Sequence, residues 1–186
     1  MEPLLEHHKQ LLAKWRGAMN LVGPGPLLAH YSDSKEGLAV LEEPSGRWAD
    51  LGTGAGFPGI VFGALYPQAT IELVDSRAKR CAFLDRVLAT AAEPTDQITV
   101  RCTRLERLED QGYDGLLSRA LASPEMMLSH GRRLLKPGGL LVLMLQEDGV
   151  IPDGEDFSLL RVHTYTTDGK PRKSALLSWQ PADDDD

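Results

Sequence analysis

Apolar residues recur at helical spacing near the start of the chain. They predict an amphipathic helix over residues 3–19, beginning at Pro3 and carrying on one face Leu4, Leu5, His8, Leu11, Leu12, Trp15 and Met19. The stretch "NLVGPGP" breaks this helix, and a second helical pattern, weakened by Gly37, runs from Leu27 to about Glu43. Residues 1–44 are therefore predicted to form an N-terminal helical segment.

From residue 45 the pattern alternates between strands and helices. Short apolar runs predict strands at 47–51, 70–75, 98–102 and 113–118, and helices begin at Pro58, span 77–92 and end near Lys136 at "KPGG". The strand "LLVLML" is apolar enough to be buried on both faces. Two last strands, 159–166 and 174–179, are separated only by the loop "TDGKPRK" and must form an antiparallel hairpin. This order predicts an α/β fold with a mostly parallel, doubly wound, seven-stranded sheet over residues 45–181.

Composition fits one ordinary soluble domain. The 186 residues are 42% hydrophobic and 25% charged, and the longest apolar run, Leu140–Leu145, is too short to cross a membrane. No secretory signal is visible, which favours the cytoplasm. Two cysteines cannot supply a zinc site alone, so no metal is expected. The net charge is −7, of which Asp183–Asp186 contribute four, and residues 182–186 are expected to form a disordered acidic tail.

The glycine-rich stretch "DLGTGAGFPG" (50–59) joins the first predicted strand to its helix. Such a loop lets the backbone approach a ligand, and Asp75, which ends the next strand, is placed to accept hydrogen bonds from ribose hydroxyls. NAD and S-adenosylmethionine (SAM) both contain that ribose. Asp50 favours SAM, because a carboxylate would repel a pyrophosphate but tolerates an ammonium and a sulfonium. The closing strand hairpin is likewise familiar from class I SAM-dependent methyltransferases, which have a Rossmann-like sheet.

With these pieces placed, the sequence resembles the glucose-inhibited division protein B family, bacterial enzymes that methylate N7 of a guanosine in 16S ribosomal RNA. The matching stretches are "HYSDS" (30–34), "DLGTGAGFPGI" (50–60), "LVDSRAKRCAFL" (73–84), "TRLERL" (103–108), "YDGLLSRALAS" (113–123) and "LLKPGG" (134–139). The resemblance implies SAM as cofactor and ribosomal RNA, or the small ribosomal subunit, as partner. The enzyme is expected to be a monomer.

The resemblance also assigns site residues. It implies that the cofactor is bound by Asp50, Gly52, Gly54, Gly56, Phe57, Asp75, Leu105, Glu106 and Arg119. Gly52, Gly54 and Gly56 would pass beneath the methionine part, Asp75 would hold the ribose, and Leu105 and Glu106 would flank the adenine. Arg119 and His30, the latter grouped with Asp33 and Ser34, would be the catalytic candidates. A surface ion pair for Arg119 and a helix-surface position for His30 are the plainer alternatives.

This chain departs from the family pattern at three positions. A lysine followed by glycine usually ends the fifth strand, where Leu145 and Gln146 stand here, and Leu121 replaces an aromatic residue. The chemistry itself demands little of the protein, because guanine N7 is an acceptor that loses no proton before attacking a methyl group. Correct placement of the reacting atoms can then suffice, without a general base.

An RNA substrate requires basic residues at the edge of the sheet where the cofactor binds. The candidates are Arg77, Lys79 and Arg80, after the second strand, and Lys170, Arg172 and Lys173, in the predicted hairpin loop. Two alternatives remain open. The acidic net charge and the missing lysine suit a small-molecule methyltransferase, and Leu121 and Leu145 suit a SAM-binding regulatory protein without turnover.

Overall fold

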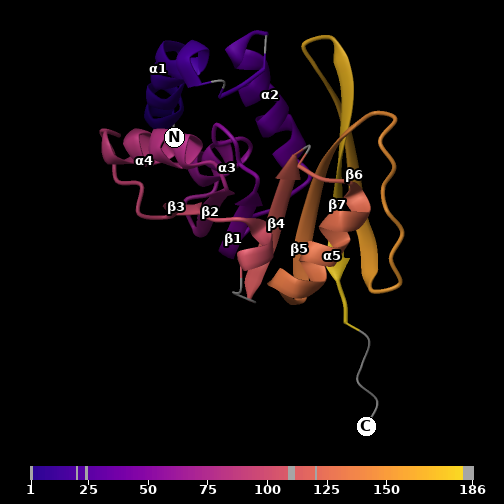
Figure 1. The fold of residues 1–186 in the computed structure, drawn as a ribbon. Helices are drawn as coiled ribbons and strands as arrows, with labels where there is room; N and C mark the ends of the chain where they lie inside the picture. Colours follow the sequence, from indigo (N-terminus) through magenta and orange to yellow (C-terminus); the bar gives the residue numbers. More distant parts are fainter. Residues whose placement is uncertain (1, 20, 24, 109–111, 120, 182–186) are drawn as a thin grey trace.

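A sheet of seven strands runs through the part of the chain that the computed structural model describes, residues 2–19, 21–23, 25–108, 112–119 and 121–181 (Figure 1). Its order is β3-β2-β1-β4-β5-β7-β6, and the strands from β3 to β5 in that order are parallel while β7 is antiparallel to both neighbours. The strands are β1 (Gly46–Leu51), β2 (Ala69–Asp75), β3 (Ile98–Cys102), β4 (Tyr113–Arg119), β5 (Leu135–Gln146), β6 (Phe157–Thr167) and β7 (Lys170–Trp179). The predicted α/β fold with a closing hairpin is confirmed.

Helices cover both faces of this sheet. They are α1 (Glu2–Met19), α2 (Leu27–Leu38), α3 (Gly59–Leu65), α4 (Ala78–Ala89) and α5 (Pro124–Leu134), with a 3-10 turn at Leu105–Arg107. One apolar core joins α1–α4 to the sheet through residues such as Leu12, Phe62 and Leu84, and a second joins α5 to the opposite face through Met127 and Leu128. Figure 1 shows α5 in front of the strands, apart from the group of α1–α4.

The helix α2 is shorter than the sequence pattern predicts. It ends at Leu38 instead of near Glu43, and the chain turns at Ala39. The turn brings the side chains of Val40 and Leu41 into the core, where they are 0% and 7% exposed. Burial of these two residues after the turn therefore outweighs continuation of the helix.

The "KPGG" stretch lies inside β5 and does not follow the end of a helix at Lys136, as predicted. Helix α5 ends at Leu134, and the pairing of β4 with β5 steps from Tyr113–Leu135 to Gly115–Leu140. Residues 136–139 thus bulge out of the ladder. Pro137 has no N–H to donate to a neighbouring strand, and Gly138 has φ +78°, so both residues suit a bulge.

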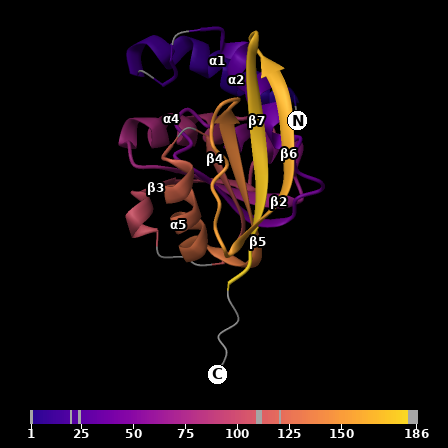
Figure 2. The ribbon, with the colours of Figure 1, turned by 90° about the vertical axis from the view of Figure 1, so that its right-hand side faces the viewer.

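The closing hairpin turns more tightly than the predicted loop. Asp168 and Gly169 both have positive φ (50° and 68°), as a two-residue hairpin turn requires, so β7 begins at Lys170. Lys170, Arg172 and Lys173 consequently lie on a strand, which corrects their placement in a loop. Because β6 and β5 are both antiparallel to β7, the turn lies at the edge where the parallel strands end. Figure 2 shows this hairpin rising beside α2.

Within the described residues, no helix is both long and apolar enough to cross a bilayer, and no cluster of metal-ligating side chains is found. The predicted acidic tail, residues 182–186, lies outside the described residues.

Candidate active site

The glycine loop connects β1 to α3 at the point where the strand order reverses between β1 and β4. Gly52, Gly54 and Gly56 have φ values of +71°, +62° and +103°, a region that other residues adopt only with strain. A Cβ on Gly52 would also lie 2.2 Å from the Leu121 Cδ1 atom. Ligands of open α/β sheets bind at such a switch point, so a ligand is expected to bind against this loop.

Asp50 lies beneath the loop and supports it. Its carboxyl group is fully buried, and Oδ2 accepts a hydrogen bond of 2.8 Å from the Gly59 amide at the start of α3. Burial raises the pKa of Asp50 to about 6, an effect that Thr53 and the Gly59 amide oppose. Asp50 does not line the cavity beside the loop. It would therefore affect cofactor binding by holding the loop in place, not by touching the cofactor as predicted.

A cavity of about 490 Å³ opens beside the loop. Its lining brings together four of the predicted cofactor residues, Gly52, Asp75, Leu105 and Glu106, with Arg77 and Arg80 from the predicted RNA-binding set. Leu121, Ala122, Met126 and His130 complete the wall on the side of β4 and α5. This volume lies within the range of small-molecule and cofactor sites.

Asp75 is held in place at the inner side of this cavity. Its side chain is almost fully buried, Oδ2 accepts from the Gly54 amide at 3.1 Å, and Oδ1 accepts from the Arg77 amide at 2.8 Å. Arg80 also donates to Oδ2 at 3.1 Å. The carboxylate therefore connects the glycine loop with the start of α4, and the partly exposed Arg80 covers it on the cavity side.

A second hollow, of about 290 Å³, contains the two catalytic candidates. Arg119 Nη1 donates to Asp33 Oδ2 at 3.0 Å, and its guanidinium lies 5.2 Å from the centre of the Phe57 ring, on which His30 stacks at 5.4 Å. Burial and the charge of Arg119 lower the pKa of His30, which favours a neutral ring. Phe57 thus brings Arg119 and His30 together, and the ion pair considered for Arg119 exists with Asp33.

Residues from the closing hairpin complete this second hollow. The Tyr165 hydroxyl donates to Asp33 Oδ1 at 3.2 Å, and Arg172 Nε lies 3.9 Å from the same oxygen. Arg172 also donates to Gln146, its register partner on β5. Sequence reasoning did not single out Tyr165, although it lies next to the last residue of the predicted strand 159–166.

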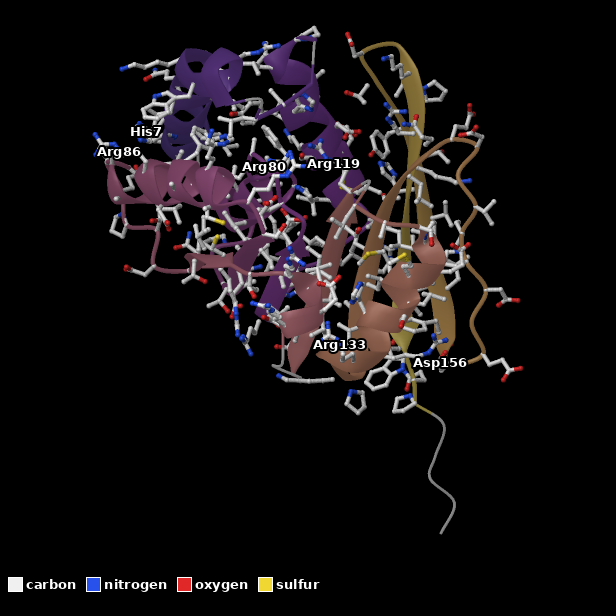
Figure 3. All side chains as sticks on the ribbon, in the orientation of Figure 1. His7, Arg80, Arg86, Arg119, Arg133 and Asp156 are labelled. Carbon is white, nitrogen blue, oxygen red and sulfur yellow. The ribbon has the colours of Figure 1, made fainter. Side chains whose placement is uncertain are left out.

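The remaining basic candidates lie at the same edge of the sheet. Lys79 is exposed on α4, Lys170 is exposed at the start of β7, and Lys173 is half-buried opposite Leu145. Arg80 and Arg119 lie at this edge in Figure 3, whereas Arg133 and Asp156 lie at the opposite end of the molecule.

Sequence comparison places the chain among known proteins. The family model for rRNA small subunit methyltransferase G matches residues 1–155. Proteins named ribosomal RNA small subunit methyltransferase G are 36% identical over 140 residues in Rhodospirillum centenum and 32% identical over 185 residues in Pseudomonas fluorescens. These alignments cover 73% and 94% of this chain. The chain spans 63% of the length of the first relative and 83% of the second.

Solved structures share the fold at low sequence identity. A mutant of MtNAS in complex with S-adenosylmethionine has a TM-score of 0.65 at 14% identity, covering 97% of this chain and 73% of that one. A protein described as a predicted O-methyltransferase, from Agrobacterium tumefaciens, has a TM-score of 0.64 at 20% identity, covering 78% and 80%. These likenesses show the fold of class I methyltransferases. The family match over residues 1–155 and the relatives at 32–36% identity show that the chain belongs to the rRNA small subunit methyltransferase G family.

Proposed function

We propose that this protein is a SAM-dependent methyltransferase that modifies guanine N7 in small-subunit ribosomal RNA. The observation that carries the proposal is the cavity at the switch point of the sheet, where Gly52, Asp75, Leu105 and Glu106 line one wall. These residues stand at the positions that the family pattern assigns to the cofactor, and the relatives are named as ribosomal RNA methyltransferases.

The cavity suits SAM chemically. Asp75 would accept hydrogen bonds from the ribose hydroxyls, with Arg80 moving aside, and Glu106 would accept from the adenine amine against the apolar side of Leu105. The bare backbone at Gly52 permits close approach of the methionine part. Gly54 and Gly56 would shape the loop around it, and Asp50 would keep the loop in place through Gly59. When bound, SAM supplies a methyl group on a positively charged sulfur.

The residues of the second hollow would present the target base. Guanine N7 attacks with a lone pair in the plane of the ring, and no proton has to be removed from it first. His30 is therefore not needed as a general base, although its ring is neutral. Arg119 and His30, both packed on Phe57, would instead orient the base beside the cofactor cavity. Catalysis would rest on alignment of N7 with the methyl carbon and sulfur.

Basic side chains at this edge would hold the RNA backbone. One group comes from the start of α4 and the residue before it: Arg77, Lys79 and Arg80. The other comes from the hairpin: Lys170, Arg172 and Lys173. Arg77 and Arg80 line the cofactor cavity, so RNA phosphates held there would lie beside the cofactor. The proposed partner is therefore the small ribosomal subunit or its RNA, bound by a monomer in the cytoplasm.

The test is methyl transfer to a defined nucleotide. Small ribosomal subunits from cells lacking this gene would be incubated with the protein and labelled SAM, and 7-methylguanosine would then be mapped in the RNA. We expect the label at one guanosine, which is already methylated in cells that carry the gene. Transfer only to small molecules would support the small-molecule alternative, and SAM binding without any transfer would support a regulatory protein.

A further inference from the structure

Asp33 lies in the second hollow as the carboxylate on which its donors converge. Arg119, at the end of β4, and Tyr165, on β6, donate hydrogen bonds to it, and the guanidinium of Arg172, on β7, forms an ion pair with it at 3.9 Å. The side chain of Asp33 is 15% exposed and that of Arg119 is 20% exposed, so a ligand in the hollow can still reach both. A carboxylate and a guanidinium thus face the hollow side by side.

This pair complements one edge of one nucleobase. Guanine presents two neighbouring donors, N1–H and the N2 amine, next to the acceptor O6. A carboxylate accepts from two neighbouring donors, and an adjacent guanidinium donates to the oxygen beside them. Adenine has an acceptor at N1 and a donor at N6. In the same position its N1 would face the carboxylate, acceptor against acceptor, and its N6 amine would face the guanidinium, donor against donor.

We propose that Asp33 and Arg119 select guanine by binding its N2, N1 and O6 edge in this hollow. The inference rests on the proposed function, and it explains why guanine N7 would be the atom that is methylated. N7 lies on a different edge of the base, so it stays free to face the cofactor cavity. That cavity begins at Leu121 and Ala122, just beyond Arg119 on the chain.

Neighbouring groups prepare Asp33 for this role. Burial and the nearby carboxylate raise the pKa of Tyr165, so its hydroxyl stays protonated and keeps donating to Oδ1. The guanidinium of Arg172 adds positive charge 3.9 Å from Asp33 Oδ1. The ring of Phe57, packed against His30 and Arg119, fixes the position of the guanidinium.

Binding of mononucleotides tests the proposal. The probes are GMP, IMP, which lacks the N2 amine, and AMP, each titrated calorimetrically into the protein saturated with S-adenosylhomocysteine. We expect the wild-type protein to bind GMP about tenfold more tightly than IMP or AMP, since one good bidentate contact discriminates bases to this degree. Equal binding of the nucleotides, or no binding of GMP, would overturn the proposal without any variant being made.

A matched pair of variants locates the preference. Asp33→Asn keeps the shape of the side chain but places a donor where an acceptor is needed, so the preference for GMP should fall to about twofold or less. Glu36→Gln makes the same charge change at an exposed position of α2 and should retain the preference. An undiminished preference in the Asp33→Asn protein would refute the role of Asp33.

Methyl transfer to ribosomal subunits, measured on the same samples, separates this inference from the proposed function. If the wild-type protein methylates N7 of a guanosine but GMP selection does not depend on Asp33, the inference alone fails. If S-adenosylhomocysteine does not bind and no transfer occurs, the proposed function fails.

Discussion

At the scale of single residues, the carboxylate of Asp75 accepts hydrogen bonds from three parts of the candidate cofactor site. Its oxygens accept from the amides of Gly54 and Arg77 and from the guanidinium of Arg80. The backbone donors fix the direction of the carboxylate, and Arg80 is the partner that a ligand can replace. The position of Asp75 at the end of the second strand is visible in the sequence, because a strand that ends in Asp is a local pattern.

Replacement of Asp75 by Ala should weaken SAM binding strongly. The loss of charge-assisted hydrogen bonds to the ribose removes about 1.5–3 kcal/mol, which corresponds to roughly 10- to 150-fold in Kd. Isothermal titration calorimetry measures this. Asp85→Ala, an exposed carboxylate on α4, is the control and should leave the affinity unchanged. An unaltered Kd for the Asp75 variant would remove it from the cofactor site.

Gly52 illustrates a requirement for space as well as for conformation. Gly52→Val should lose SAM binding, because the new side chain would occupy the cavity beside Leu121. Gly138→Val carries a similar left-handed strain, costing about 1–2 kcal/mol, but it has open space around its Cβ and lies in the bulge of β5. Both variants should melt at lower temperature, and only the first should lose the cofactor. Parallel loss of binding in both would point to instability alone.

At the scale of elements, the N-terminal helix is connected to the glycine loop through His8. The imidazole is fully buried, Nε2 donates to the Ala55 carbonyl at 2.7 Å, and Nδ1 accepts from the Tyr31 hydroxyl at 2.6 Å. Phe57 and Phe83 pack against the ring. Because Ala55 offers only an acceptor, Nε2 carries the proton of the neutral ring. Helices α1 and α2 therefore help to hold the loop that precedes α3.

This histidine should make the fold sensitive to acid. Burial lowers the pKa of His8 to about 4, below its unfolded value near 6.5, so the unfolded chain binds more protons between these values and stability falls as the pH falls. Asp50 has the opposite effect on stability. Its raised pKa lets the folded state bind a proton from about pH 6 downwards, before the unfolded chain does, so its contribution to the free energy of unfolding increases as the pH falls. A measurement on the wild type alone would mix the two contributions.

The contribution of His8 can be isolated with His8→Gln, whose amide can still donate to Ala55. Between pH 7 and pH 4.5 the wild type should lose more unfolding free energy than this variant, by on the order of 2–3 kcal/mol, since Asp50 is common to both. Urea unfolding at several pH values gives the two slopes. Identical slopes would show that His8 does not titrate as its burial demands.

Element boundaries also show where sequence reasoning fell short. Periodicity predicted the succession of helices and strands, because each period reflects which positions of an element are buried. The end of α2 and the bulge at "KPGG" depended on contacts with distant residues, so local signals misplaced them. The Asp168-Gly169 turn had a local signal that was not used, and its neglect put Lys170, Arg172 and Lys173 in a loop.

Over the whole molecule, charge is unevenly distributed despite the net value of −7. Basic side chains from α4 and the hairpin lie on either side of the site, while Arg132 and Lys136 at the other end pair with Asp156 and Asp114. Of these basic side chains, Arg80 pairs with Asp75 and Arg172 with Asp33, and Lys79 and Lys170 are exposed at the same edge. Net charge by itself was a poor guide, because the fold decides which charges share a surface.

The salt dependence of RNA binding checks this arrangement. Lys170→Gln combined with Lys173→Gln should weaken binding of ribosomal RNA and reduce the slope of log K against log[salt] by roughly 1–2, as expected for lost phosphate contacts. The pair Arg132→Gln and Lys136→Gln, at the opposite edge, should leave the slope unchanged. If the Lys170 and Lys173 double variant has the same slope as the wild type, the hairpin does not contact the RNA.

The sequence by itself determined the α/β succession, the glycine loop and the acidic residue that ends the second strand, because each depends on local periodicity or on backbone conformation within a few residues. Tertiary structure alone decided that Asp33, Arg119, Tyr165 and Arg172, which are separated by up to 139 positions, meet in one hollow. Strand order and register set such meetings, and they follow from packing over the whole sheet, which short stretches of sequence do not encode.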